Sequence, residues 1–401
     1  MNQRTILTAF LAVAALISST SRAAFPTFKE QELPEKITVG YGVLLLDLNG
    51  DSKPDIVVAD SKRVIWFENP TWTMHVILEG QTAPDNVAIA PIDMRGNGRT
   101  CLVLGAGWKG YNTKDNSTLQ WLEPGDDVKQ PWTMHPIPFD QVSLHRLHTG
   151  VINGKPRVIV APLLGRGASA AADYAEATPS LLEYSIPADP VKGPWKPEVI
   201  TDKLHVTHNF SFVDWEGLGR NSILLASYEG IWHLTPKGEN QWDSVQLGAG
   251  EQANPKASRG SSEVKLGHGK DRKAFLAAIE PWHGNEVVVY TPGKSGEGLW
   301  ERKVIESGLK EGHGLWTADI DGSGADSIIA CSRAGNAGNG RGVFAYTSKE
   351  DGSWERHVID DKGMAGEDLA AMDLNGDGKI DIVAVGRATH NIKIYWNESG
   401  K

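Results

Sequence analysis

Two nine-residue segments carry acidic and amide side chains at alternating positions, a spacing that suits a bound divalent cation. In the first, Asp47, Asn49, Asp51 and Asp55 place oxygen atoms at positions 1, 3, 5 and 9, and the main-chain carbonyl at position 7 is a further donor. The second repeats this spacing with Asp373, Asn375, Asp377 and Asp381. Calcium takes roughly six to eight oxygen ligands, so both segments are predicted to be calcium loops.

A third loop, with Asp319, Asp321 and Ser323, matches the pattern less fully and is a further candidate. In the related segments around Asp93 and Asp214, a side chain that cannot coordinate calcium occupies a ligand position. Apolar strands, not helices, flank all of these loops. We therefore expect the calcium to stiffen turns between strands rather than to take part in catalysis.

The loops belong to a repeated unit of apolar strand, turn and apolar strand. Its clearest copies are Val43–Ala59 and Leu369–Val385, and weaker copies surround Asp93, Asp214 and Asp319. Two further copies, at 150–160 and 264–279, keep the strands but have lost the acidic loop. Seven copies spaced about 45 to 62 residues apart are typical of the blades of a β-propeller.

Each copy continues with a third strand, such as 64–68, and a fourth that repeats Trp-x-x-x-x-Ile, such as 72–77. The last copy stops after its third strand, near Trp396, and residues 28–33 resemble an isolated fourth strand. We therefore predict an all-β fold over residues 24–401, a seven-bladed β-propeller with four-stranded blades, closed by the N-terminal strand. The loop and strand pattern resembles the FG-GAP/VCBS repeat family, which implies structural calcium in blades one and seven, and in blade six if the weaker loop binds.

The ends and the composition restrict location and partners. Residues 1–23 have the features of a cleaved signal peptide: Arg4, an apolar stretch over 6–18 and small residues before the expected cleavage point. We therefore expect a secreted or periplasmic protein without a membrane span. The net charge of −10 argues against nucleic acid and anionic membranes as partners. Cys101 and Cys331 lie in apolar strands of distant repeats and are expected to be buried free thiols.

Propeller geometry predicts where a site would form. Residues that begin the first strand of each blade, and those that join strands two and three, should meet around the central channel on the face opposite the calcium loops. The candidate catalytic residues there are His145, Arg146, His208, Glu263, His313 and Glu367. The candidate substrate-binding residues are Tyr41, Asn86, Trp108, Arg166, Trp282, His283, Asp368, Arg387 and His390. Trp108 and Trp282 suit either stacking against a sugar ring or packing between blades.

Segments at these positions resemble a known group. The phrases LHRLHTG at 144–150, HVTHNF at 205–210, IEPWHGN at 279–285 and GRATHN at 386–391, with PLLGRGA and EDLAA, are similar to the propeller domain of the aldos-2-ulose dehydratase family and its bacterial relatives. The resemblance implies a lyase that acts on keto-sugars, with a histidine in the propeller as the base. The fungal members of this family carry additional cupin domains. Chemistry that belongs to those domains is not part of this expectation.

Elimination of water next to a carbonyl needs a base for the α-proton, a group that stabilises the enolate and an acid for the departing hydroxyl. We expect His145 or His208 to be the base, and Arg146 or a divalent metal in the channel to stabilise the enolate. Glu263, His313 or Glu367 would fill the remaining roles. Two alternatives stay open: a non-catalytic, calcium-stabilised propeller that binds carbohydrate or protein, and a polysaccharide lyase that uses the arginines to neutralise a uronate.

Overall fold

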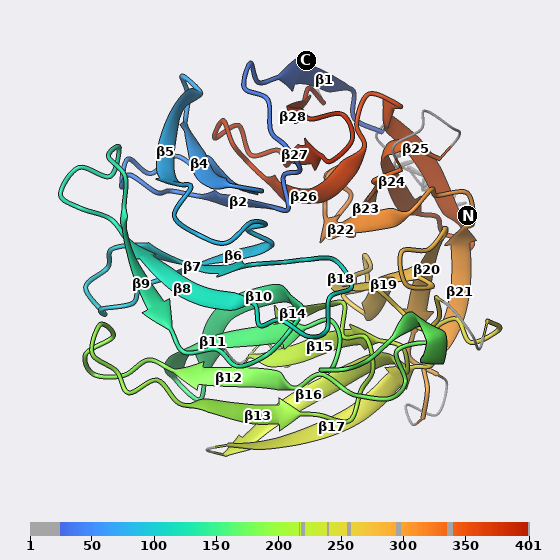
Figure 1. The fold of residues 1–401 in the computed structure, drawn as a ribbon. Coiled ribbons are helices and arrows are strands. Elements are labelled where there is room, and N and C mark those ends of the chain that lie inside the picture. Colours follow the sequence, from blue (N-terminus) through green and yellow to red (C-terminus); the bar gives the residue numbers. More distant parts are fainter. Residues whose placement is uncertain are drawn as a thin grey trace, which may run out of the picture.

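The computed structural model describes residues 25–401, except 216, 218–220, 239, 255–257, 294–297, 335–339 and 400–401. Its strands form seven four-stranded sheets in which all neighbours are antiparallel, and the sheets succeed one another around a common axis (Figure 1). The predicted all-β, seven-bladed propeller is therefore confirmed. The predicted signal peptide over residues 1–23 lies outside the described residues.

Within blades one to six, the chain runs from the innermost strand to the outermost, and in blade seven β1 supplies the outermost strand. Blade one contains β2 (Gly42–Leu46), β3 (Asp55–Asp60), β4 (Arg63–Glu68) and β5 (Thr73–Glu79). Blade two contains β6 (Ala88–Ile92), β7 (Cys101–Ala106), β8 (Thr118–Glu123) and β9 (Thr133–Ile137). Blade three contains β10 (Leu144–Ile152), β11 (Lys155–Pro162), β12 (Leu181–Ser185) and β13 (Pro197–Thr201), with a short 3-10 helix η1 (Ala170–Ala172) between β11 and β12.

The second half of the ring repeats this order. Blade four contains β14 (Asn209–Val213), β15 (Ser222–Ser227), β16 (Gly230–Gly238) and β17 (Gln241–Gly248). Blade five contains β18 (Glu263–His268), β19 (Ala274–Glu280), β20 (Glu286–Thr291) and β21 (Glu301–Glu306). Blade six contains β22 (Gly312–Ala318), β23 (Ser327–Ser332), β24 (Gly342–Ser348) and β25 (Trp354–Asp361). Blade seven contains β26 (Gly366–Met372), β27 (Asp381–Gly386), β28 (Ile392–Asn397) and β1 (Phe28–Glu32).

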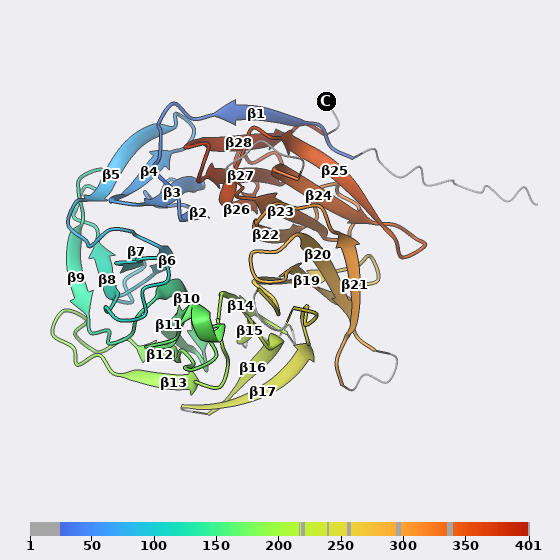
Figure 2. The same ribbon diagram turned by 45° about the vertical axis from the view of Figure 1, so that its right-hand side comes forward.

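The N-terminal strand closes the ring, as predicted. β1 pairs antiparallel with β28, from Phe28 opposite Asn397 to Glu32 opposite Lys393, and the two strands lie side by side in both views (Figures 1 and 2). The Lys393 ammonium lies 2.8 Å from Glu30 and 2.7 Å from Asp360, so it joins β1 and β28 to blade six. The pairing covers an edge of β28 that would otherwise be open to association with another strand.

The core lies between neighbouring blades. The second strands are almost entirely apolar and buried on both faces, as in Ile56–Ala59 and Ile328–Cys331. The third strand of each blade carries at least one large aromatic residue, among them Trp66, Trp121, Tyr184, Trp232, Tyr290, Tyr346 and Tyr395. Cys101 and Cys331 are buried and free, as expected. None of the helices in the described residues has the length and apolar character that a membrane crossing requires.

The predicted calcium loops are tight turns between the first and second strands. Asp47 accepts main-chain N–H groups from Gly50, Asp51 and Ser52, and Asp373 accepts the equivalent bonds in blade seven. The last acidic residue of each loop, besides being a predicted calcium ligand, accepts hydrogen bonds from the main chain. Both carboxylate oxygens of buried Asp55 accept main-chain N–H groups, from Leu48 and Asn69, and Asp381 repeats the arrangement. Calcium binding by these loops stays a prediction.

Candidate functional site

Three histidines converge on the axis of the propeller from three different blades. His145 begins blade three on β10, His208 immediately precedes β14, and His313 lies near the start of β22. The ring centroids of His145 and His208 are 4.5 Å apart, and those of His208 and His313 are 5.2 Å apart. One ring nitrogen of each lies within 4.8 Å of the others, which is close enough for all three to bind one metal ion.

The orientation of each ring is set by the neighbouring blade. The Nδ1 atoms of His145, His208 and His313 lie 2.9, 3.0 and 2.6 Å from the main-chain carbonyls of His208, Ser262 and Glu367, respectively. A carbonyl only accepts, so each Nδ1 carries the proton and each Nε2 presents a lone pair. The Nε2 atom of His313 has no hydrogen-bond partner although it is buried. This arrangement, in which the outer nitrogen is held by a carbonyl, is typical of metal-binding histidines.

Burial keeps these imidazoles neutral. The three side chains are at most 5% exposed. Desolvation, followed by the positive charge of Arg146, lowers the pKa of His145 well below its usual value, and desolvation with Arg333 does the same for His313. Desolvation also lowers the pKa of His208, although Glu263 opposes the shift. Neutral imidazole is the form that binds a metal.

His283, from the link between β19 and β20, joins the cluster as a fourth histidine. Its Nε2 lies 2.8 Å from Nε2 of His208, and its Nδ1 lies 3.0 Å from Nη2 of Arg333. A guanidinium only donates, so Nδ1 of His283 accepts and its Nε2–H donates to Nε2 of His208. Nε2 of His208 would therefore exchange this hydrogen bond for a metal ion if the three histidines bind one. Desolvation lowers the pKa of His283 well below its usual value. The sequence placed His283 among substrate-binding residues, and the structure places it in direct contact with the triad.

Two buried carboxylates flank the histidines. Glu367, 3% exposed, accepts a hydrogen bond of 2.9 Å from Arg387, while its second oxygen has no hydrogen-bond partner and lies 3.9 Å from Arg333. Glu263, 2% exposed, accepts a hydrogen bond of 2.6 Å from Asn209 and lies 3.3 Å from Nδ1 of His208. The structure therefore brings five of the six predicted catalytic residues to one cluster. The sixth, Arg146, lies beneath it, 3.5 Å from Nε2 of His145.

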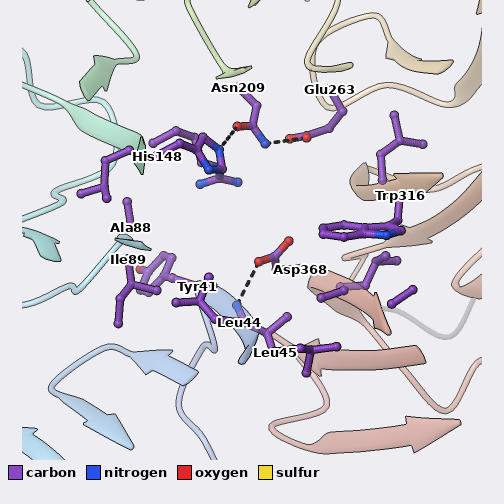
Figure 3. Close-up of a pocket in the computed structure, with 18 of the residues that line it drawn as sticks. Tyr41, Leu44, Leu45, Ala88, Ile89, His148, Asn209, Glu263, Trp316 and Asp368 are labelled. Carbon is purple, nitrogen blue, oxygen red and sulfur yellow. Dashed lines mark hydrogen bonds between the residues drawn. The ribbon is translucent and has the colours of Figure 1, made fainter. Parts of the chain in front are cut away.

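Cavities lie on both sides of this layer. On the face opposite the calcium loops, an open cavity of about 480 Å³ is lined by Thr38, Val39, Glu311, Arg333, Arg387, Ala388 and His390. On the calcium-loop side, a cavity of about 230 Å³ follows the innermost strands and is lined by Tyr41, Arg146, His148, Asn209, Glu263, Lys265, Trp316 and Asp368, among others (Figure 3). We call the second space the inner cavity.

The other predicted residues differ in their distance from the cluster and in their roles. Asn86 is fully buried and bonds the main chain of Asp60, and exposed Arg166 bonds Asn116 and Asp140. Trp282 packs against Tyr228 and Tyr174, which favours blade packing over stacking with a sugar. The half-buried Trp108 ring lies 5.0 Å from His145 and remains available to a ligand.

Sequence reasoning missed several residues of the inner cavity, above all His148, Lys265 and Trp316. They follow the start of their strands by a few positions, and the prediction considered only the strand starts and the links between second and third strands. Polar residues within an otherwise apolar innermost strand, such as Lys265 in Glu-Val-Lys-Leu-Gly-His, were the available signal.

Comparison with known proteins supports the family resemblance that the sequence phrases indicated. Residues 117–293 match the family described as the β-propeller domain of aldos-2-ulose dehydratase. The chain is also 29% identical over 234 residues to aldos-2-ulose dehydratase of Phanerodontia chrysosporium, which covers 53% of this chain. The chain resembles the propeller domain of aldos-2-ulose dehydratase. It spans only 25% of that enzyme, so the activity of the whole enzyme does not transfer to this propeller without a test.

Similarity to solved structures supports the propeller fold and carries no information about function. BBS1N in complex with ARL6DN has a TM-score of 0.56 at 13% identity over 94% of this chain and 99% of the other. A chain of the mitotic checkpoint complex has a TM-score of 0.55 at 10% identity over 98% of this chain and 99% of the other. The histidine cluster is therefore a more specific guide to chemistry than these neighbours are.

Proposed function

We propose that this propeller is a metal-dependent carbon–oxygen lyase that eliminates water from a small keto-sugar at the histidine cluster. The observation that carries the proposal is the convergence of His145, His208 and His313, each with Nδ1 held by a carbonyl and Nε2 turned to the others. The resemblance to the aldos-2-ulose dehydratase propeller supports the substrate class and the reaction.

The three histidines fit a divalent transition metal such as zinc. Three neutral imidazoles with an open fourth position are typical of catalytic zinc sites, and harder ions such as calcium prefer oxygen donors. The unpartnered Nε2 of His313 supports this assignment, because a buried lone pair without a partner is costly. When bound, the metal would act as a Lewis acid toward the carbonyl oxygen of the substrate.

If the histidines hold the metal, another group must move the proton. Glu367 and Glu263 each have one carboxylate oxygen without a hydrogen-bond partner. That oxygen of Glu263 lies 3.3 Å from Nδ1 of His208, whereas Arg387 holds only the other oxygen of Glu367, so Glu367 is the better candidate. In the proposed reaction, Glu367 takes the α-proton and returns it to the departing hydroxyl, which leaves as water. Arg333, 3.9 Å from Glu367 and bonded to His283, adds positive charge beside the developing enolate. This assignment replaces the expectation of a histidine base.

The arginines on the open face favour a neutral substrate over a uronate polymer. Arg333 lies 3.3 Å from Glu311, and Arg387 lies 2.9 Å from Glu367. Both cations therefore already have carboxylate partners within the protein, which leaves less positive charge for a uronate. A small carbohydrate entering the open cavity remains the proposed partner. Calcium in the acidic loops and export of the chain through a signal peptide belong to the same proposal.

The experiment measures the bound metal and the reaction together. Purified protein should contain about one equivalent of a transition metal and should convert keto-sugars to products with enone absorbance. His313→Ala should lose both the metal and the activity, whereas Glu367→Gln should keep the metal and lose activity by about 100-fold or more.

His75→Ala is the matched control, because His75 is a histidine of the outer strand β5 and should leave both readouts unchanged. Metal-containing wild-type protein that binds sugars without forming product would support the non-catalytic binding propeller instead. Product from acidic polysaccharides alone would support a polysaccharide lyase.

A further inference from the structure

The inner cavity contains a lysine that the proposed reaction does not use. Lys265 is the third residue of β18, in the innermost layer of blade five, and its side chain lines the cavity. In the described part of the chain, its ammonium makes no hydrogen bond or ion pair. The amine lies over the ring of Trp316, whose centroid is 5.9 Å from Nζ. Lys393, by contrast, is neutralised by two carboxylates.

The surroundings of Lys265 disfavour its charged form. Desolvation is the largest influence on its pKa and lowers it, and the nearby Arg146 guanidinium acts in the same direction. Glu263 and Asp368 oppose the shift without reversing it. An amine whose pKa is lowered is a nucleophile over a wider pH range than a surface lysine is.

The cavity also contains an acid for the second half of amine chemistry. The Asp368 carboxyl group projects toward the middle of the cavity, and one oxygen accepts a hydrogen bond of 3.0 Å from the main-chain N–H of Val43 (Figure 3). Desolvation raises the pKa of Asp368 to about 6. A fraction of Asp368 is therefore protonated near neutral pH and can donate a proton inside the cavity.

We propose that Lys265 captures a small polyhydroxylated aldehyde or ketone in the inner cavity as a reversible Schiff base. The neutral amine attacks the carbonyl carbon, a C–N bond forms, and the C=O π pair moves to oxygen. Transfer of a proton from nitrogen to oxygen gives the carbinolamine. Asp368 then protonates the hydroxyl group, which leaves as water while the C=N bond forms, and the resulting iminium can return its proton to Asp368.

The lining determines the class of ligand. Leu44, Leu45 and the indole of Trp316 offer apolar surface to the C–H face of a sugar, and Asn209 and His148 offer hydrogen bonds to hydroxyl groups (Figure 3). The charged groups are balanced, with Arg146 and Lys265 against Glu263 and Asp368, so an uncharged ligand is favoured. The volume of about 230 Å³ is below the range usual for drug-sized ligands, so the ligand is small.

The ligand reaches the cavity from the calcium-loop face. Leu46 and Met372 line the cavity at the ends of β2 and β26, immediately before the predicted calcium loops, and Met372 is 38% exposed. The capture site therefore differs from the histidine cluster, where the proposed elimination takes place, and from the open cavity on the opposite face through which its substrate would enter.

The test traps the imine on the full chain. Protein is incubated at pH 7 with dihydroxyacetone and sodium cyanoborohydride, whose hydride reduces the C=N bond to a stable amine, and modified lysines are located by peptide mass spectrometry. The fraction modified at Lys265 should exceed that at the exposed Lys196 and Lys203 by about 10-fold or more. Glycerol, which has the hydroxyl groups without the carbonyl, should give no adduct.

Two variants keep the outcome interpretable. Lys265→Arg keeps the charge and cannot form an imine, and a melting curve shows that it is folded. Its loss of adduct at this position, with unchanged labelling of Lys196 and Lys203, supports the assignment. His313→Ala should lose the elimination activity but keep the adduct at Lys265. The elimination proposal and the capture proposal can therefore be tested independently. Labelling of Lys265 no faster than that of the two exposed lysines overturns the capture site.

Discussion

At the scale of single residues, several histidines lie near the propeller axis, where burial lowers their pKa values and disfavours their charged forms. His148 is one of them, and it lies outside the metal-binding triad. Its ring packs at 89° against Phe210, with centroids 4.7 Å apart, and its Nε2 lies 3.4 Å from the side-chain oxygen of Asn209. Lys265, Arg146 and Glu263 are the charged groups that influence it.

Acid should destabilise the fold through His148. Desolvation, helped by Lys265 and Arg146, lowers the pKa of His148 to about 4, whereas the unfolded chain titrates near 6.5. Between these values the unfolded state binds more protons, so the free energy of unfolding decreases as pH falls from 6.5 to 4 and His148 contributes no further change below pH 4. The full effect is about 3 kcal/mol, at about 1.4 kcal/mol for each pKa unit.

Urea denaturation from pH 7 to pH 4 measures this contribution. His148→Asn should lose some stability at every pH because it loses the contact with Phe210, but its stability should decrease less steeply than that of the wild type in this window. Equal slopes for the two proteins would contradict the assignment. His75→Ala serves again as the histidine control.

At the scale of elements, an acidic side chain stabilises the turn between the first and second strands in blades one, two and seven without a bound metal. Asp47 and Asp373 each accept three main-chain N–H groups, and Asp93 closes the corresponding turn in blade two with two. The same acidic residue can therefore serve a turn with or without calcium. Only the complete ligand sets in blades one and seven make a strong prediction of binding.

Calcium should raise the melting temperature through these two loops. The double variant Asp47→Asn, Asp373→Asn keeps an oxygen acceptor for the turn but loses two negative ligands, so it should lose most of the stabilisation. Calcium at 100 times its dissociation constant stabilises by about 2.7 kcal/mol per site. Differential scanning calorimetry with added calcium, after dialysis against chelator, measures the shift.

Asp93→Asn is the matched control in a loop that lacks a ligand, and its response to calcium should equal that of the wild type. A double variant that responds to calcium as strongly as the wild type would remove blades one and seven as binding sites.

At the scale of the whole molecule, a single strand closes the ring. β1 contributes five residue pairs with β28, and Lys393 connects it to blade six through Glu30 and Asp360. These bonds bring residues from the two ends of the chain together. Without them, β28 would present an open strand edge.

Removal of residues 25–33 should therefore lower the melting temperature and promote association. The exposed edge of β28 can pair with another copy, so light scattering after gel filtration should detect species larger than the wild type, increasing with concentration. A synthetic peptide of residues 25–34 should reverse the change by pairing with β28. An unchanged melting temperature and elution volume would show that β1 is dispensable for closure.

The repeats determined the architecture without help from tertiary structure. A repeated unit of apolar strands and turns is local information, so the seven blades, their four strands and the missing last strand could all be counted along the chain. Closure by residues 28–33 followed from that count. The strand starts also predicted which histidines would meet, because every blade places its first strand at the axis.

Only the tertiary structure decided the roles within the site. Hydrogen bonds from His145, His208 and His313 to carbonyls of the next blade determine which nitrogen faces the axis, and no spacing along the chain encodes contacts between residues 54 to 63 positions apart. The same is true of Lys265, whose position near Arg146, Trp316 and Asp368 depends on four separate blades. Repeats specify local geometry, whereas the pKa and reactivity of a side chain depend on neighbours that the closed ring supplies.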